Sequence, residues 1–267
     1  MSQQQYFATG REFESERERL SILEQLFDAA THRSLAQIGV SEGWRCCEIG
    51  AGGGSVTRWL AQAVGSSGKV VAVDLDTRFL ADIDQPNVDV IKADFLSDAP
   101  LGGSFDLVFT RFVLFHLPNP KQAIYRMVQL VKPNGWLFVI DCDLCNLSAA
   151  DPGHRNAGHF DEVYQRRLAY HREHYNYNNR MGRSLSKLFE EAGLVDVNNS
   201  AWTSVSRGGS LEAEFWRRTF EVSTPKMMAD GVLSREENER FLSTMTDPTF
   251  LFLDALWFQA TGRKPPM

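Results

Sequence analysis

Residues 44–55 constrain the fold of this chain more than any other stretch. They read as a short apolar strand that ends on Glu48, continues into a turn with four glycines, and leads directly into a helix whose apolar residues recur at helical spacing from Val56. Glycine has no Cβ, so such a turn can adopt backbone angles closed to other residues and lets a ligand lie against the main chain. The segment therefore predicts a strand–turn–helix unit with a binding site at the turn.

A strand, a glycine turn and a helix occur in two kinds of nucleotide-binding fold, and the two differ in the sequence of the turn. A dinucleotide site uses G-x-G-x-x-G, so that the pyrophosphate rests on the helix N-terminus. Counting from Gly50 places Ser55 at the third glycine position, and counting from Gly52 places Thr57 there. The carboxylate of Glu48 would repel a pyrophosphate, whereas it suits a ligand with an amino group and a sulfonium. A turn without a ligand, or a nucleotide site of another kind, is the alternative.

The pattern E-x-G-x-G-x-G, from Glu48 to Gly54, resembles motif I of the class I S-adenosylmethionine (SAM)-dependent methyltransferases. The resemblance covers about residues 45–140 by motif and the rest by layout, and it is strongest to the bacterial small-molecule group that includes the ubiquinone/menaquinone-type enzymes. It implies an α/β, Rossmann-like fold with a seven-stranded, mostly parallel sheet and helices on both faces. It also implies SAM as the cofactor, with Gly50 and Gly52 in the cofactor-binding turn.

Two further predicted strands also end on acids. In a βαβ unit, a carboxylate at the tip of the second strand, here Asp74, accepts hydrogen bonds from the ribose hydroxyls, and Leu75 would then pack on the adenine. The alternative role for Asp74 is to cap the next helix. Asp94 and Phe95 follow the third strand and resemble the adenine site of the family, where a carboxylate accepts from the exocyclic amine and a ring covers the base.

The N-terminal region is expected to cover the cofactor. Over about residues 11–38, apolar residues recur at helical spacing among many charged residues, which predicts one or two amphipathic helices. In methyltransferases that resemble this chain, a Tyr or Arg of the N-terminal helix meets the cofactor carboxylate, which nominates Tyr6 and Arg19. Arg111, at the end of the fourth predicted strand, is another cofactor-binding candidate. The alternative for the charged run at residues 14–19 is a solvated helix face.

Size and charge limit the remaining choices. The chain has 267 residues and is 43% hydrophobic, so it can form one domain over residues 1–267, with a helical cover at 1–40 and substrate-side insertions at 142–181 and 207–247. A net charge of -6 argues against a nucleic-acid partner. The sequence shows neither a signal peptide nor an apolar run that could span a bilayer. We expect a cytoplasmic protein with a small-molecule substrate and no membrane partner, and we leave a homodimer open.

The second half of the chain is expected to complete the sheet and to carry the insertions. The predicted elements are a helix at 121–131, a fifth strand at 136–141, a helix at 182–192, a sixth strand at 195–205, helices at 211–221 and 234–245 separated by Pro225, and a reversed last strand at 250–261.

Methyl transfer from a sulfonium depends mainly on proximity and alignment. An oxygen or nitrogen acceptor must also lose a proton, which calls for a base. His116, just beyond the fourth strand, is the first catalytic candidate, because an imidazole titrates near neutral pH; the alternative is that it only orders its loop. Asp141, at the end of the fifth strand, is the second candidate, with Asp143 next to it, as a base or as a ligand to a polar acceptor.

The insertion at 142–181 holds polar residues that could line an acceptor pocket or lie on the surface: His154, His159, His171, His174, Tyr175 and Tyr177. Cys142 and Cys145, with His154 and His159, have a spacing that could indicate zinc, but the gap between the pairs differs from that of zinc fingers. We predict no metal, and we expect all four cysteines to be thiols in a reducing compartment.

The function expected from these features is transfer of a methyl group from SAM to the O, N or C atom of a small molecule. The concentration of aromatic residues in the C-terminal half favours a bulky acceptor, such as a secondary metabolite or a quinone-like ring. The first alternative is a protein of this fold that binds SAM but catalyses a non-methylating cyclisation or rearrangement. A nucleotide-dependent dehydrogenase and a partner-binding module without a cofactor are the others.

Overall fold

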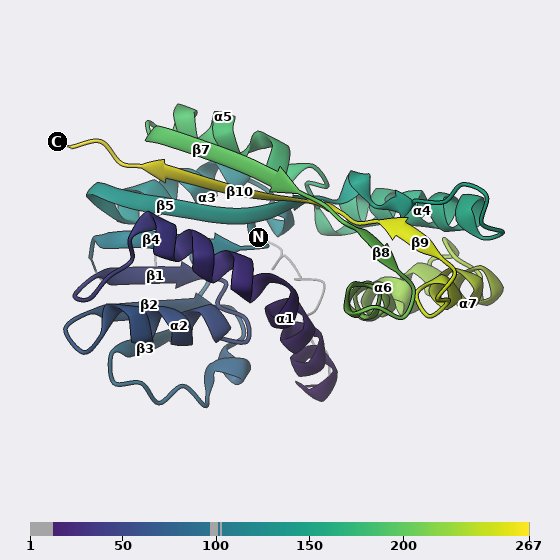
Figure 1. The fold of residues 1–267 in the computed structure, drawn as a ribbon, viewed down its shortest axis with the longest axis horizontal. Coiled ribbons are helices and arrows are strands. Elements are labelled where there is room, and N and C mark those ends of the chain that lie inside the picture. Colours follow the sequence, from purple (N-terminus) through teal and green to yellow (C-terminus); the bar gives the residue numbers. More distant parts are fainter. Residues whose placement is uncertain (1–12, 97–100, 102, 267) are drawn as a thin grey trace.

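The centre of the molecule is a seven-stranded sheet, seen in a computed structural model that describes residues 13–96, 101 and 103–266 (Figure 1). Its strands are β1 (Arg45–Ile49), β2 (Lys69–Asp74), β3 (Val88–Lys92), β4 (Phe105–Arg111), β5 (Val131–Asp143), β7 (Val195–Trp202) and β10 (Leu256–Arg263). The strand order is β3-β2-β1-β4-β5-β10-β7, and only β10 runs antiparallel to its neighbours. The predicted Rossmann-like sheet with a reversed last strand is confirmed.

Helices cover both faces of this sheet (Figure 1). They are α1 (Phe13–Ile38) and α2 (Ser55–Val64) on one face, and α3 (Pro120–Leu130) and α5 (Leu185–Glu191) on the other, with the 3₁₀ turn η4 (Met181–Ser184) before α5. Successive side chains of a strand point to opposite faces, so Cys46 packs in the core under α1 and α2, whereas Cys47 packs in the core under α3 and α5. Burial on both faces explains why these strands are continuous apolar runs.

The strand order reverses between β1 and β4, which places a topological switch point in the middle of the sheet. Open α/β sheets bind ligands outside the carboxyl ends of the strands at such a point. Glu48 near the end of β1 and Asp74 at the end of β2 lie on adjacent parallel strands. The fold thus brings together the acids that the sequence places far apart.

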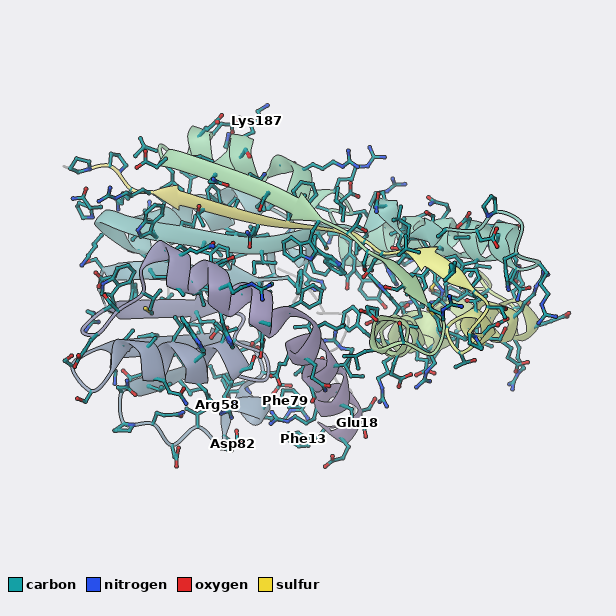
Figure 2. The ribbon with its side chains drawn as sticks, in the orientation of Figure 1. Phe13, Glu18, Arg58, Phe79, Asp82 and Lys187 are labelled. Atoms are coloured by element: carbon teal, nitrogen blue, oxygen red, sulfur yellow. The ribbon has the colours of Figure 1, made fainter. Side chains whose placement is uncertain are left out.

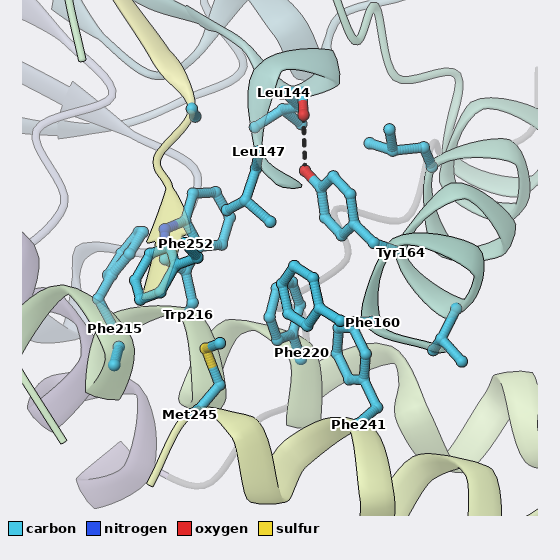
Figure 3. Close-up of a cluster of buried hydrophobic side chains, with 14 of the residues drawn as sticks. Leu144, Leu147, Phe160, Tyr164, Phe215, Trp216, Phe220, Phe241, Met245 and Phe252 are labelled. Carbon is cyan, nitrogen blue, oxygen red and sulfur yellow. Dashed lines mark hydrogen bonds between the residues drawn. The ribbon is translucent and has the colours of Figure 1, made fainter. Parts of the chain in front are cut away.

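A second lobe extends from the carboxyl edge of the sheet, and we call it the cap (Figure 1). It contains the helices α4 (Ala157–Tyr175), α6 (Leu211–Ala229) and α7 (Arg235–Thr244), and a small sheet of β6 (Ser148–Ala149), β9 (Leu251–Leu253) and β8 (Val205–Arg207). Aromatic side chains fill its core (Figure 3): Phe160 stacks on Phe241 with ring centroids 4.9 Å apart, and Phe220 meets Phe241 edge-on.

Two predicted strands are each divided between the two sheets. The segment expected as one strand at 195–205 forms β7 and β8, and the one expected at 250–261 forms β9 and β10. The carboxylate of Asp254 lies between β9 and β10, where it accepts hydrogen bonds from Trp216 Nε1 (2.7 Å) and from the Ala255 N–H (2.7 Å). The first segment passes from the large sheet into the cap and the second passes from the cap into the large sheet, a change of partner that local apolar patterning does not reveal.

Pro225 does not separate two helices, as predicted, but lies inside α6. A proline inside a helix removes one backbone hydrogen bond and costs about 3 kcal/mol. Here the hydroxyl of Thr224 and the guanidinium of Arg167 both donate to the carbonyl of Phe220, at 2.9 and 3.1 Å. These bonds hold the preceding turn of α6, since the carbonyl that loses its N–H donor to Pro225 is that of Glu221, four residues earlier. Burial of the aromatic face of α6 in the cap core offsets the cost of the proline.

The segment after β2 forms only a short 3₁₀ turn, η1 (Thr77–Leu80), and Asp76, not Asp74, caps it. Phe79 of this turn stacks on Phe13 of α1, with ring centroids 4.9 Å apart. Nearby, Arg58 of α2 forms an ion pair of 2.6 Å with Asp82 (Figure 2). The stacking of Phe13 on Phe79 anchors the first turn of α1 beside the end of β2, and the ion pair joins α2 to the segment after η1.

We expect Phe160→Ala to lower the free energy of unfolding by about 3–5 kcal/mol, because it leaves a cavity in the aromatic core of the cap. Phe160 is fully buried and contacts Phe241 and Phe250. Urea denaturation followed by tryptophan fluorescence measures the change. The control is Val205→Thr, at a position that is 61% exposed in the same lobe. Equal stability of the two variants would contradict the assignment of this core.

Candidate active site

A cavity of about 650 Å³ lies at the carboxyl edge of the sheet, beside the cap. Its walls come from α1, the glycine turn after β1, the loops after β2 and β3, the 3₁₀ turn η2 (Leu114–His116), α4 and α6. Ten of the predicted site residues line it: Arg19, Glu48, Gly50, Gly52, Asp74, Leu75, Asp94, Phe95, Arg111 and His116. Asp141 does not line this cavity, and Tyr6 lies outside the described residues.

The glycine turn has the backbone that its composition predicts. Gly50, Gly52 and Gly54 have φ angles of 74°, 55° and 80°, in the left-handed region that favours glycine. A Cβ at Gly50 would lie 2.3 Å from the Cγ2 of Val113. The N–H groups of Gly50 and Ala51 both donate to the carbonyl of Val73 on β2. The turn is therefore closely packed between β2 and η2, and its shape requires glycine.

Glu48 lies below this turn and is almost completely buried, with 4% of its surface exposed. The hydroxyl of Thr57 donates a hydrogen bond to its carboxyl group. Burial raises the pKa of Glu48 to about 8, and the hydrogen bond from Thr57 and the charge of Arg111 only partly oppose this shift. A cation that entered the cavity beside Glu48 would compensate the ionised form.

Asp74 is held by the backbone around it. Its two carboxylate oxygens accept hydrogen bonds from the N–H of Gly52 (2.8 Å) and from the N–H of Asp76 (2.9 Å). Burial raises its pKa, and these backbone hydrogen bonds oppose the shift. Each oxygen keeps a second lone pair that could accept from a ribose hydroxyl. Leu75, next to it, lines the cavity and is 56% exposed, so it offers an apolar surface to a base.

Asp94 and Phe95 follow β3 and differ in their surroundings. Asp94 is exposed and accepts a hydrogen bond of 2.9 Å from the N–H of Leu96. Phe95 is 5% exposed and packs in the core between the sheet and α3. Both residues line the cavity. Their predicted contact with an adenine remains a prediction.

Arg19 and Arg111 face the cavity but already have carboxylate neighbours. The guanidinium of Arg19 forms two hydrogen bonds with Glu16, of 2.6 and 3.0 Å, and both residues are buried. Arg111 donates to Asp28 and to Thr31, each at 3.0 Å. The Arg19 pair lies within α1, whereas the Arg111 pair joins β4 to α1. The predicted contact of either arginine with a cofactor carboxylate would be made in addition to an ion pair.

Glu24 of α1 is a site residue that the sequence analysis missed. Its Oε1 is buried and has no hydrogen-bond partner in the part of the chain that the structure describes. A Cβ added to Gly53 would lie 2.1 Å from this oxygen, so α1 rests directly on the glycine turn. Burial and the nearby Asp28 raise the pKa of Glu24. The available signal was an acid at i+4 from Leu20, on the apolar stripe of the helix.

His116 lies in η2 against the rings of Phe115 and Tyr177, with centroid distances of 3.6 and 4.8 Å. Burial, together with the positive charge of Arg19 and the neighbouring His171, lowers its pKa well below the ordinary value. The imidazole is therefore neutral near pH 7. It has the protonation state that a base requires, although its low pKa makes it a weak one.

The structure corrects the placement of Asp141. Its side chain is fully buried beneath η2, where one oxygen accepts hydrogen bonds from the N–H groups of Leu114 (3.0 Å) and Phe115 (3.3 Å). Burial raises its pKa to about 7. Asp143 also lies away from the cavity lining and forms an ion pair with Arg183. Asp141 fixes the turn that carries His116 and does not face the cavity itself.

The polar residues of the insertion divide into two groups. His171 and Tyr177 line the cavity, whereas His154 Nε2 lies 3.3 Å from the hydroxyl of Thr249 and His159 Nε2 lies 3.0 Å from the carbonyl of Glu237. Cys142, Cys145, Cys46 and Cys47 are free thiols. Among the described residues there is no group of three or more His, Cys, Asp or Glu side chains arranged to hold a metal ion.

Strand order, glycine turn and acidic strand ends together define the fold of the class I SAM-dependent methyltransferases, as predicted. Comparison with known proteins agrees. Residues 47–139 match the family described as the methyltransferase domain. This match covers β1 to β5, the part of the chain that carries motif I and the acidic strand ends.

Two relatives illustrate the similarity. The chain is 35% identical over 136 residues to methyltransferase str3 of Strobilurus tenacellus, a match that covers 49% of this chain and 47% of str3. It is 28% identical over 142 residues to the ubiquinone/menaquinone biosynthesis C-methyltransferase UbiE of Pseudomonas paraeruginosa, covering 48% of this chain and 56% of that protein. The chain thus spans about half the length of these curated relatives.

Solved structures share the fold. Phosphoethanolamine N-methyltransferase 2 of Haemonchus contortus, in complex with SAM, has a TM-score of 0.51 and 15% identity over 93% of this chain and 52% of its own. The [4+2]-cyclase SpnF has a TM-score of 0.51 and 15% identity over 90% of this chain and 82% of its own. At these identities the likeness concerns the fold alone. In the described part of this chain, no helix is both long and apolar enough to cross a membrane.

The buried carboxyl of Glu48 generates a pH dependence of stability. Its pKa is about 8 in the folded protein and about 4.3 in an unfolded chain, so the folded state holds a proton that the unfolded state has lost. Stability therefore falls as the pH rises from about 4.3 to about 8, by at most about 1.4 kcal/mol per pH unit.

Urea denaturation of the ligand-free protein between about pH 5.5 and about pH 8.5 measures this loss. We expect Glu48→Gln, which cannot ionise, to lose less stability over this range than the wild type. Parallel pH profiles for the two proteins would contradict the protonated state of Glu48.

Proposed function

We propose that the chain is an enzyme that transfers the methyl group of SAM to a small-molecule acceptor. The observation that carries the proposal is one continuous cavity, which joins the acidic ends of β1 and β2 to an aromatic chamber under the cap. A volume of about 650 Å³ lies within the usual range for ligand pockets, about 300–1,000 Å³. The predictions of one domain and of a cytoplasmic location stay part of this proposal.

The charges around the glycine turn fit SAM. Glu24 and Glu48 are carboxylates with no ion-pair partner among the described residues, and both have raised pKa values because they are buried. A ligand with an ammonium and a sulfonium would compensate them. Asp74 would accept from the ribose hydroxyls, and Leu75 and Asp94 would contact the base. The cofactor carboxylate would face Arg19 or Arg111.

SAM supplies a methyl group on a sulfonium, which is already an excellent leaving group. The protein must therefore hold the acceptor in line with the methyl group and exclude water. The walls of the chamber fit these tasks, since Trp216, Phe220 and Trp257 line it and are almost completely buried. They favour a bulky apolar or aromatic acceptor, such as a secondary metabolite or a quinone-like ring.

His116 is the proposed base for an oxygen or nitrogen acceptor. It is neutral near pH 7, lines the cavity, and is fixed by the packing of Phe115 and Tyr177. Asp141 acts through the backbone of η2 and so sets the position of this imidazole. We therefore propose that Asp141 positions His116 and does not itself act as the base.

We expect Glu48→Ala and Asp74→Ala each to weaken SAM binding by about 1.5–3 kcal/mol, because each removes a charged hydrogen-bond acceptor. Isothermal titration calorimetry with SAM measures the change. Asp89→Ala is the control, since Asp89 pairs with Lys69 on the surface of the sheet. Wild-type affinity in both site variants would refute the assignment of the cofactor site.

Glu24→Gln should also weaken SAM binding, by about 1–3 kcal/mol, because it removes a buried charge next to the glycine turn. Glu18→Gln is a matched control on the same helix, where Glu18 pairs with Arg218 at the surface. Gly53→Ala should also weaken SAM binding, because the added Cβ would displace the Glu24 carboxylate. If Glu24→Gln and Glu18→Gln bind SAM equally, Glu24 does not contact the cofactor.

The alternative is a SAM-binding protein that catalyses a non-methylating cyclisation or rearrangement. It is supported by the fold that the chain shares with SpnF, which is a [4+2]-cyclase. The two functions differ in one product. Incubation with SAM and a panel of aromatic acceptors, followed by an assay for S-adenosylhomocysteine, tests methyl transfer directly. The alternative is favoured if the protein binds SAM and converts a substrate to another product while no S-adenosylhomocysteine forms.

A further inference from the structure

The cap contributes one formal charge to the cavity wall. Among the described residues that line the cavity from α4 and α6, Arg167 is the only one that is charged, because His171 has a pKa of about 3 and is neutral. Arg167 is also completely buried. A buried charge without an opposite charge is costly, so its partners need to be identified.

All the partners of Arg167 are neutral. Its guanidinium donates to the carbonyl of Phe220 (3.1 Å), to Thr224 (3.0 Å) and to Asn238 (2.6 Å). It also lies over the rings of Phe220 and Phe241, at 5.4 and 4.9 Å. No carboxylate of the described chain is within ion-pair distance of it, and burial lowers its pKa to about 10. The positive charge is thus solvated by dipoles and rings but remains uncompensated.

Two further polar atoms lie unpaired in the same wall. His171 Nε2 on α4 and Thr219 Oγ1 on α6 are buried, belong to residues that line the cavity, and have no hydrogen-bond partner among the described residues. Arg167 and His171 are four residues apart on one helix face, and Thr219 precedes Phe220, whose carbonyl Arg167 binds. Buried polar atoms without partners in a cavity indicate a ligand that supplies them.

We propose that this wall is an anion subsite, and that the methyl acceptor carries a carboxylate on a flat apolar body. The carboxylate would accept from Thr219 Oγ1 and from the Nε2–H tautomer of His171, in the field of Arg167, while Trp216 and Phe220 cover the body. Arg167 acts on the ligand through its charge, which low-dielectric surroundings strengthen. The proposal rests on the proposed function, and it adds the chemical class of the acceptor.

The test compares two probes of nearly the same shape, 2-naphthoate and 2-naphthamide, titrated calorimetrically into the full chain saturated with S-adenosylhomocysteine near neutral pH. Binding of S-adenosylhomocysteine is measured first. Its absence would refute the cofactor site, and hence the proposed function, before the anion subsite is tested. We expect the carboxylate to bind at least about tenfold more tightly than the amide, as for a charge-assisted hydrogen-bond pair.

Two variants and a control assign this preference to the subsite. Arg167→Met should reduce the ratio of the two affinities to near one. Arg166→Met is the matched control, because Arg166 also joins α4 to α7, through Glu237 and the carbonyl of Val232, but does not line the cavity. Thr219→Val keeps the shape of its side chain and should reduce naphthoate affinity several-fold, so it tests the subsite even if Arg167→Met does not fold.

The proposal is overturned if the wild type binds the carboxylate no more tightly than the amide or binds neither probe. It is also overturned if Thr219→Val leaves the ratio unchanged, or if Arg166→Met lowers the ratio as much as Arg167→Met does. In the last case Arg167 would only join the helices of the cap.

Discussion

Burial of carboxyl groups at the carboxyl edge of the sheet is the constraint on which the site depends. Glu48, Asp74 and Glu24 converge there from β1, β2 and α1, and burial raises the pKa of each. Desolvation of an acid is unfavourable unless a proton or a cation compensates it. In the ligand-free protein the proton on Glu48 does so, and in the proposed complex the charge of SAM does. The same feature thus links stability, pH and cofactor binding.

The glycine turn and the first helix make this arrangement possible. The turn brings its backbone close to β2 and to η2, and α1 covers it with Glu24 and Leu20. The ion pair between Arg111 and Asp28 joins β4 to α1 above the cavity. The cap closes the other side with aromatic rings and one uncompensated guanidinium. An acidic half and an apolar half with a positive charge therefore share one cavity.

The sequence predicted the sheet and the acidic half well, because their signals are local. A strand that ends in Glu48, followed by four glycines and an amphipathic helix, has few alternative structures, and Asp74 is the last residue of β2, at the strand tip where it was predicted. The predicted single strands at 195–205 and 250–261 failed because the change from one sheet to another depends on tertiary partners. The predicted break at Pro225 was wrong because α6 continues through it while its aromatic face is buried in the cap core, a tertiary contact that the sequence pattern does not reveal.

The same distinction applies to the site residues. Asp141 was predicted as a catalytic group because it ends a strand, but the position of η2 above it decides that its carboxylate meets backbone N–H groups. Glu24, Thr219 and Arg167 lie on helices, where periodicity predicts which face is buried but not what that face meets. Polar residues within those buried stripes were the one available signal.

The number of protons released when SAM binds tests the central claim most directly. Calorimetric titrations in two buffers of different ionisation enthalpy, near pH 6.5, measure this number. If Glu48 is protonated in the free protein and ionised beside the cationic ligand, binding releases close to one proton at this pH, since the pKa of about 8 lies above it. Binding without proton release, or no binding at all, would contradict the account.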